Sequence, residues 1–226
     1  MDYRGKKVLM TGAASGIGRQ IALAYAQAGA LVIVADKDYE GDRFVREELR
    51  PLVPDCCFFH CDLALASACE NLMQSIFEQL DDLDIIINNA GVSQFCSLWE
   101  ETAEHWDYVL NSNLRSIFLV SRDYMINRRN KGYKERYGRI VNISSTRSMM
   151  SEEGTEAYTA SKGGDGTDPC PGSELCPLCG HGQLHQSRLD LLRGVRSAGI
   201  CRPPAAPVRT GGTSGGCGVR LPVPHR

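Results

Sequence analysis

The stretch from Ser145 to Lys162 holds three side chains that could together move a proton. Tyr158 comes thirteen residues after Ser145, and Lys162 comes four residues after Tyr158. Residues four apart on a helix share one face, so the phenol and the ammonium group would be neighbours. A nearby ammonium group favours the phenolate form of a tyrosine, which suits the phenol to exchange a proton with an alcohol. Tyr-x-x-x-Lys pairs also occur on solvated helix faces, so the elements around this one must decide whether it is a site.

A glycine-rich turn follows the first apolar segment of the chain. Residues 7–11 (KVLMT) are a short apolar run, residues 12–18 are GAASGIG, and apolar residues then recur at helical spacing. This pattern predicts a strand, a tight turn and a helix. Glycines let the backbone approach a pyrophosphate, whose charge is met by the free N–H groups at the start of the helix. The spacing G-x-x-x-G-x-G differs from the commoner G-x-G-x-x-G of dinucleotide-binding proteins.

An acidic residue ends the second apolar run. Residues 30–35 (ALVIVA) are followed by Asp36, eighteen residues after Gly18. A carboxylate at this point can accept hydrogen bonds from a ribose 2′-hydroxyl and repels a 2′-phosphate. The sequence therefore favours NAD over NADP, although Lys37 beside it weakens the preference. The alternative is that Asp36 is only a turn residue.

Further apolar runs alternate with helical patterns. They cover residues 56–62, 83–87 and 139–143, and the last of them leads to Ser145. Strands that alternate with helices predict an α/β fold with a Rossmann-like, doubly wound parallel sheet. Such sheets bind ligands at the carboxyl ends of their strands, where Ser145 would lie.

Two polar segments are expected to face solvent. Asn113 falls inside a mostly helical region, residues 101–127, where an amide is usually exposed. The basic segment 127–138 (NRRNKGYKERYG) is interpreted as a solvated connection rather than a binding patch. Cys56, Cys57, Cys61 and His60 are not expected to bind a metal, because neighbouring strand residues point to opposite faces.

Composition excludes several classes of partner. The chain of 226 residues is 42% hydrophobic and 23% charged, enough for one ordinary globular domain. A net charge of -2 and a pI of about 6.2 give no reason to propose nucleic acid or an acidic membrane as a partner. No stretch approaches the roughly 20 apolar residues of a membrane span, and the first residues lack a signal-peptide pattern. A cytoplasmic protein with free thiols is expected.

In this order, the motifs resemble those of the classical short-chain dehydrogenases/reductases. The resemblance covers residues 3–164 and rests on TGAASGIG, the Asp after the second strand, Cys61-Asp62-Leu63, NNAG, Asn113, Ser145 and YTASK. It implies an NAD-dependent oxidoreductase that moves hydride between nicotinamide and a small alcohol or ketone. Homo-oligomers are usual in the family, whereas for this chain they are less expected.

The resemblance also assigns roles to residues. It implies that the cofactor is held by Gly12, Ser15, Gly16, Ile17, Gly18, Asp36, Asp62, Leu63, Asn89, Tyr158 and Lys162. It implies a catalytic tetrad of Asn113, Ser145, Tyr158 and Lys162. Tyr158 would be the general acid or base, Ser145 would hydrogen-bond the substrate oxygen, and Asn113 would hold a water that relays protons to Lys162.

The sequence changes character after Gly164. We expect residues 1–164 to form a truncated nucleotide-binding domain. Residues 165–226 are rich in Gly, Pro and Cys and contain no Phe, Tyr, Trp, Met, Asn or Lys, which predicts disorder.

Three interpretations of this tail are open. Shifting its codons by one nucleotide is compatible with family-like segments in the right order, so we favour a frameshift near Gly164. A zinc knuckle at Cys176, Cys179 and His181 and a genuine partner-binding extension are the alternatives. Under the frameshift interpretation, the chain would be an inactive remnant that keeps at most nucleotide binding.

Overall fold

The computed structural model describes residues 2–133 and 136–164. Their elements are, in order, β1 (Lys7–Thr11), α1 (Gly16–Gln27), β2 (Leu31–Asp36), α2 (Glu40–Phe44), η1 (Val45–Leu49), β3 (Cys57–His60), α3 (Ala66–Leu80), β4 (Ile85–Asn88), α4 (Ala103–Leu110), η2 (Asn111–Arg115), α5 (Ser116–Asn130), β5 (Arg139–Asn142), η3 (Thr146–Ser148) and α6 (Glu156–Gly164). Of the η segments, η1 and η2 are π-helical and η3 is a 3₁₀ turn. The zinc knuckle, the out-of-frame tail and the division after Gly164 concern residues outside those described.

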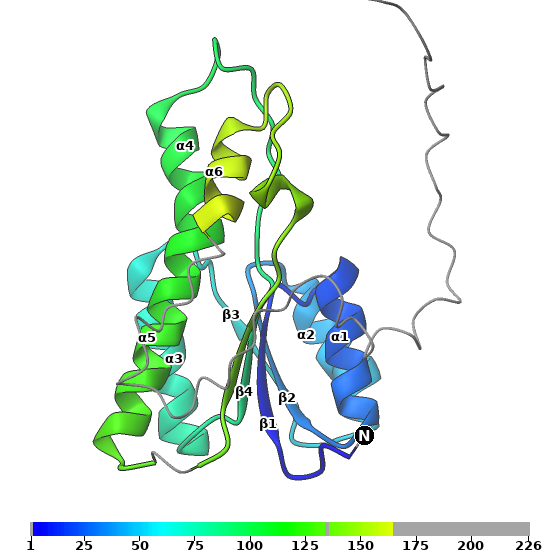
Figure 1. Ribbon diagram of the computed structural model, residues 1–226. Coiled ribbons are helices and arrows are strands. Elements are labelled where there is room, and N and C mark those ends of the chain that lie inside the picture. Colours follow the sequence, from blue (N-terminus) through cyan, green and yellow to red (C-terminus); the bar gives the residue numbers. More distant parts are fainter. Residues whose placement is uncertain (1, 134–135, 165–226) are drawn as a thin grey trace, which may run out of the picture. The chain divides into compact units, whose positions relative to one another are not determined.

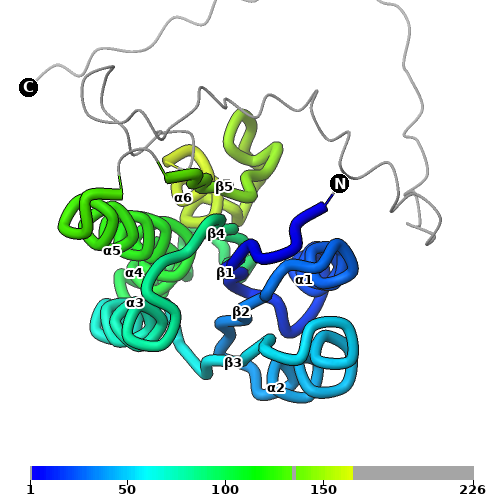
Figure 2. Tube along the Cα trace, turned by 90° about the horizontal axis from the view of Figure 1, so that it is seen from below, coloured from blue at the N-terminus to red at the C-terminus, as the bar shows by residue number. Residues whose placement is uncertain are grey.

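The strands form one parallel sheet in the order β3-β2-β1-β4-β5. Helices α1 and α2 cover one face, and α3, α4 and α5 lie on the other (Figures 1 and 2). This arrangement confirms the predicted α/β, Rossmann-like fold. It also brings the carboxyl ends of β1, β4 and β5 together at one edge, beside α6 (Figure 1).

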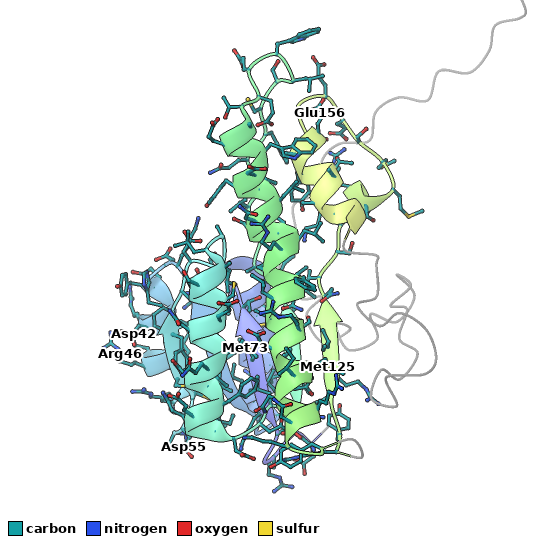
Figure 3. The ribbon with its side chains drawn as sticks, turned by 90° about the vertical axis from the view of Figure 1, so that its left-hand side faces the viewer. Asp42, Arg46, Asp55, Met73, Met125 and Glu156 are labelled. Carbon is teal, nitrogen blue, oxygen red and sulfur yellow. The ribbon has the colours of Figure 1, made fainter. Side chains whose placement is uncertain are left out.

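Alternation along the strands divides the core into two layers. In β1, Val8 and Met10 pack under α1, whereas Leu9 packs on the opposite face. Met73 of α3 belongs to that second layer, and Met125 of α5 packs against it (Figure 3). Strands buried on both faces are continuous apolar runs in the sequence, which is why these strands could be predicted from it.

The expectation of a solvated segment at 127–138 was wrong in part. Helix α5 continues to Asn130, and Arg128 near its end is fully buried. Its guanidinium group pairs with the Asp82 carboxylate, with Nε–Oδ1 and Nη2–Oδ2 distances of 3.1 and 2.9 Å. The partner lies 46 residues earlier in the chain, so no local pattern could reveal it.

Among residues 2–133 and 136–164, no helix combines the length and apolar character needed to cross a membrane.

Candidate active site

The turn between β1 and α1 can be built only from glycine at two positions. Gly12 has a φ of +68°, and a Cβ there would lie 2.6 Å from the Cα atom of Ala90. A Cβ on Gly18 would lie 2.1 Å from the carbonyl oxygen of Gly12. Side chains would therefore force the turn away from the loop after β4, and glycine keeps the backbone open to a ligand.

Asn89 braces this turn from the neighbouring strand. Its Nδ2 donates to the carbonyl oxygens of Thr11 and Gly12 at 3.1 and 2.7 Å. In return, the Thr11 hydroxyl accepts the backbone N–H groups of Asn89 and Ala90, both at 3.1 Å. Asn89 thus holds the turn in shape through its side chain. Sequence reasoning missed Thr11, whose partners come from β4 and the loop after it.

A cavity of about 420 Å³ opens at this edge of the sheet. The predicted cofactor residues that line it are Gly12, Ser15, Ile17, Gly18, Asp36, Asp62, Leu63 and Asn89. Gly16, Tyr158 and Lys162, also predicted to touch the cofactor, are not part of the lining. Residues that sequence reasoning did not assign to the site include Lys37, Asp38 and Ser112. The volume is within the range of small-molecule sites.

The carboxylate of Asp36 connects the second strand to the glycine turn. Its Oδ2 accepts the backbone N–H of Ala14 at 2.8 Å, and its Oδ1 accepts that of Asp38 at 3.0 Å. Beside it, Lys37 donates from Nζ to the Tyr108 hydroxyl at 2.7 Å, which raises the pKa of Lys37. The lysine charge is therefore drawn toward α4.

Asp62 and Cys61 line the same cavity next to the start of α3. Asp62 accepts the backbone N–H of Ala64 at 3.0 Å through Oδ1. Burial raises the pKa of the Cys61 thiol to about 11, which keeps it protonated at neutral pH. Within the described residues, Cys56, Cys57, Cys61, Cys69 and Cys96 are free, and no group of three His, Cys, Asp or Glu side chains is placed to hold a metal.

Ser145 follows the carboxyl end of β5, and Tyr158 and Lys162 lie on α6. Ser145 caps η3, and its Oγ accepts the backbone N–H of Arg147 at 3.2 Å. Helix α6 packs against η3, and the buried Lys162 donates from Nζ to the carbonyl oxygen of Ile143 at 3.1 Å. This bond ties the helix that carries Tyr158 to the segment that carries Ser145.

Asn113 is fully buried, contrary to its expected exposure. It lies in the π-helical segment η2 between α4 and α5. Its Nδ2 donates to the carbonyl oxygen of Val92 and to the hydroxyl of Ser161, at 2.9 and 3.0 Å. Its Oδ1 accepts the backbone N–H of Val92 at 2.7 Å. The amide is satisfied by tertiary partners, which explains why a polar residue is stable in this interior.

Tyr158 has an aromatic neighbour and a cationic one. The ring of Phe95 meets it edge-on, with centroids 5.8 Å apart. The hydrogen bond to Glu152 raises the pKa of Arg147, and the nearby Tyr158 phenol adds to that effect. The Phe95 loop is fastened by a bond from the Cys96 N–H to the Gly154 carbonyl, 3.1 Å long. Sequence reasoning did not single out Arg147.

The geometry can be compared with that of known proteins. A family model described as short chain dehydrogenase matches residues 6–165. An uncharacterized oxidoreductase from Thermotoga maritima is 36% identical over 163 residues, which is 71% of this chain and 61% of the relative. A 3-oxoacyl-(acyl-carrier-protein) reductase from the same organism is 33% identical, over 73% of this chain and 65% of the relative.

A solved structure gives the same result. The crystal structure of a protein from Sinorhizobium meliloti, assigned to the short-chain alcohol dehydrogenases, superposes with a TM-score of 0.66 at 30% identity. The match covers 72% of this chain and 63% of that one. The chain thus spans less than two thirds of the length of these relatives. Because the family model matches most of the sequence and the relatives share about a third of its residues, the chain belongs to the short-chain dehydrogenase family.

Proposed function

We propose that this protein is an NAD-dependent oxidoreductase that transfers hydride between nicotinamide and an alcohol or ketone. The observation that carries the proposal is the position of the glycine-lined cavity. It opens at the carboxyl ends of the strands, the end of the sheet where β5 leads to Ser145 and where Lys162 of α6 bonds the Ile143 carbonyl, although neither residue lines it. Ligands of open α/β sheets bind at this edge.

The residues of the cavity fit a dinucleotide. Gly12 and Gly18 leave room that a Cβ would fill, and the start of α1 offers backbone N–H groups to a pyrophosphate. Ser15 precedes α1 and Gly16 and Ile17 begin it, and Asp62 and Leu63 of the cavity lining would contact the adenine. When bound, the nicotinamide ring supplies the hydride donor or acceptor.

The chain's own residues would handle the proton. In alcohol oxidation, Tyr158 takes the hydroxyl proton while hydride leaves the carbinol carbon, and in ketone reduction it returns that proton. Ser145 hydrogen-bonds the reacting oxygen. Lys162 supports the phenolate and the ribose. Asn113 acts as a positioning residue, because its side chain links the Val92 loop to Ser161 on α6.

Charge in the cavity supports NAD over NADP. Asp36 and Asp38 both line the part next to β2, where a ribose 2′-phosphate would meet two carboxylates. Lys37 keeps its charge while its ammonium group donates to the Tyr108 hydroxyl, so one cation stands against the two carboxylates and offsets them in part. A 2′-hydroxyl is therefore the better fit, since carboxylates accept its hydrogen bond.

The catalytic assignment is tested with Tyr158→Phe. We expect turnover on a panel of alcohols and ketones to fall by about 10²- to 10⁴-fold, the usual contribution of a general acid or base. NADH affinity, measured by fluorescence, should change little. Tyr137→Phe, at the opposite end of β5, is the matched control and should keep full activity. Unchanged turnover in Tyr158→Phe would refute the assignment.

The cofactor preference is tested with Asp36→Asn. This change keeps an acceptor for the Ala14 N–H and removes one negative charge. We expect NADPH to gain affinity relative to NADH, measured by titration of both cofactors. Asp107→Asn, on the exposed face of α4, should leave the ratio as it is. Tighter NADPH than NADH binding by the unmodified chain would contradict the preference.

The second candidate is a remnant that binds the nucleotide without turnover. It is motivated by the change in composition after Gly164 and by the share of each relative that the chain spans. NADH binding with no activity on the whole panel would favour this candidate, and any turnover that depends on Tyr158 would exclude it. Resequencing the codons for residues 163–167 tests the frameshift itself.

A further inference from the structure

Arg147 lies at the reacting edge of the sheet without a role in the proposed chemistry. It follows Ser145 by two residues, and its backbone N–H donates to the Ser145 hydroxyl oxygen. Its side chain is 22% exposed. A cationic residue whose backbone bonds the Ser145 hydroxyl is a candidate for recognising a substrate.

The guanidinium group of Arg147 is only partly satisfied by the described residues. Its Nη2 pairs with the carboxylate of Glu152. Its Nη1 is buried and has no hydrogen-bond acceptor in the described part of the chain. Buried donors in native proteins nearly always have a partner, so this atom indicates an acceptor that lies beyond the described residues, and a bound molecule would supply one.

The surroundings define what that acceptor would be attached to. Helix α6, which carries Tyr158, packs against η3, which carries Arg147, and Phe95 packs edge-on against the Tyr158 ring. A molecule whose oxygen meets the phenol would therefore lie beside the exposed Phe95 ring, close to the segment that carries Arg147. Those are the contacts of an anionic group and of an apolar body.

We propose that Arg147 binds a carboxylate of the substrate, and that the substrate class is hydroxy acids and the corresponding oxo acids with an apolar body. This inference rests on the proposed function. The planar guanidinium fork matches a carboxylate better than any other side chain does. Phosphate-bearing molecules share the charge and are one arm of the test.

The Glu152 carboxylate pairs with Arg147 where the substrate carboxylate would bind. Its backbone is held on both sides by Thr155, through the Glu152 N–H to Thr155 Oγ1 bond and the Thr155 Oγ1 to Glu152 carbonyl bond. Its side chain is nevertheless 67% exposed. Because Nη1 is buried, an arriving carboxylate would displace the exposed Glu152 side chain and then bond both nitrogens.

The reaction leaves the recognised group unchanged. In oxidation, hydride passes from the carbinol carbon of the hydroxy acid to the nicotinamide, the hydroxyl proton passes to Tyr158, and the carbon–oxygen double bond forms. In reduction, the same hydride and proton return. The carboxylate neither gains nor loses electrons, so Arg147 orients the substrate and is not a proton carrier.

The experiment compares oxo acids with their methyl esters on the full chain. We measure kcat/KM with NADH for each pair in the unmodified protein and in Arg147→Gln, Arg147→Lys and Arg129→Gln. The unmodified protein should prefer the acid. Arg147→Gln should lower the acid-to-ester ratio by about 10- to 100-fold, the equivalent of a hydrogen bond to a charged group. The acid-to-ester ratio of Arg147→Lys should fall between the ratios of the unmodified protein and Arg147→Gln. The ratio of Arg129→Gln, at an exposed position, should equal that of the unmodified protein.

Binding measurements keep the inference separate from the proposed function. Calorimetric titration of the oxo acid, its ester and the corresponding phosphonate needs no turnover. If turnover is absent but the acid binds tighter than the ester and loses this advantage in Arg147→Gln, the proposed function fails and the inference stands. Equal affinity for acid and ester, equal losses for both, or a preference for the phosphonate would overturn the inference, even in an active enzyme.

Discussion

Arg128 and Arg147 lie at opposite ends of the same sheet and differ in how many hydrogen-bond partners their guanidinium groups have among the described residues. Arg128, beside the amino end of β4, is 1% exposed and bonds both oxygens of Asp82. Its Nη1 donates to the carbonyl oxygen of Arg136, and its Nη2 also donates to those of Leu83 and Tyr137. Arg147, beyond the carboxyl end of β5, holds one exposed carboxylate and keeps a buried nitrogen without a described partner.

This difference indicates that the amino end of the sheet serves stability and the carboxyl end serves ligand binding. At the amino end of the strands, the buried Arg128 guanidinium group has all its partners within the described residues. It therefore stabilises the fold and has no nitrogen left for a ligand. At the carboxyl end, glycines replace side chains and polar atoms face a cavity. Substitutions at the two ends should therefore change different measurements.

The largest effect is expected at the amino end, for Arg128→Met. It leaves the buried Asp82 carboxylate with only the longer ion pair to Arg136, whose Nε lies 3.5 Å from Oδ2. Breaking a buried pair costs about 3–5 kcal/mol of the free energy of unfolding in comparable cases. Urea unfolding monitored by circular dichroism measures the loss. Under native conditions, NADH affinity per folded molecule should stay the same, because the cavity lies at the other edge.

The double variant Arg128→Met with Asp82→Leu is the matched control. It removes both charges, so most of the lost stability should return. If the single variant unfolds at the same urea concentration as the unmodified chain, the buried pair does not stabilise the fold and the comparison between the two ends fails.

Gly18→Ala is expected to cost less stability than Arg128→Met and to weaken NADH binding more. The added Cβ would lie 2.1 Å from the Gly12 carbonyl oxygen and 2.5 Å from Asn89 Nδ2, so the turn must shift. Overpacking of this kind costs about 1–3 kcal/mol. NADH affinity should fall by more than tenfold, as measured by fluorescence titration, because the turn shapes the cavity.

Gly5→Ala separates a displaced turn from a strained backbone. Gly5 lies just before β1 and has a φ of +75°. A Cβ added there would have open space around it. Alanine there should cost about 1–2 kcal/mol from backbone strain alone. NADH affinity should be unaffected. A loss of NADH binding in Gly5→Ala equal to that in Gly18→Ala would show that general instability, rather than the turn, governs binding.

The sheet could be predicted from the sequence because its strands carry local patterns. The bounds of β1 match the predicted strand, and the glycine turn and Asp36 follow from the spacing after β1 and β2. Buried strands are continuous apolar runs, and such runs need no knowledge of distant residues. Most predicted cofactor residues accordingly line one cavity.

The misjudged residues have partners far away in the chain. Asn113 was expected at the surface because its partners, Val92 and Ser161, lie 21 and 48 residues away. Arg128 was expected in solvent because nothing near it in the sequence is acidic and buried. A polar side chain is stable inside a protein when its hydrogen bonds are made, and sequence spacing alone does not show which bonds those are.

The smallest effect is expected for Thr102→Ala, which tests a purely structural contact at the carboxyl end. Thr102 caps α4 by accepting the His105 N–H at 3.1 Å, and it is exposed. Loss of a cap costs about 1 kcal/mol, measured by urea unfolding, whereas Thr102→Ser should keep most of it. NADH affinity should not change, since the cap lies outside the cavity lining. A cost as large as that of Arg128→Met would mean that the carboxyl end also carries the stability of the fold, and the division between the two ends would have to be abandoned.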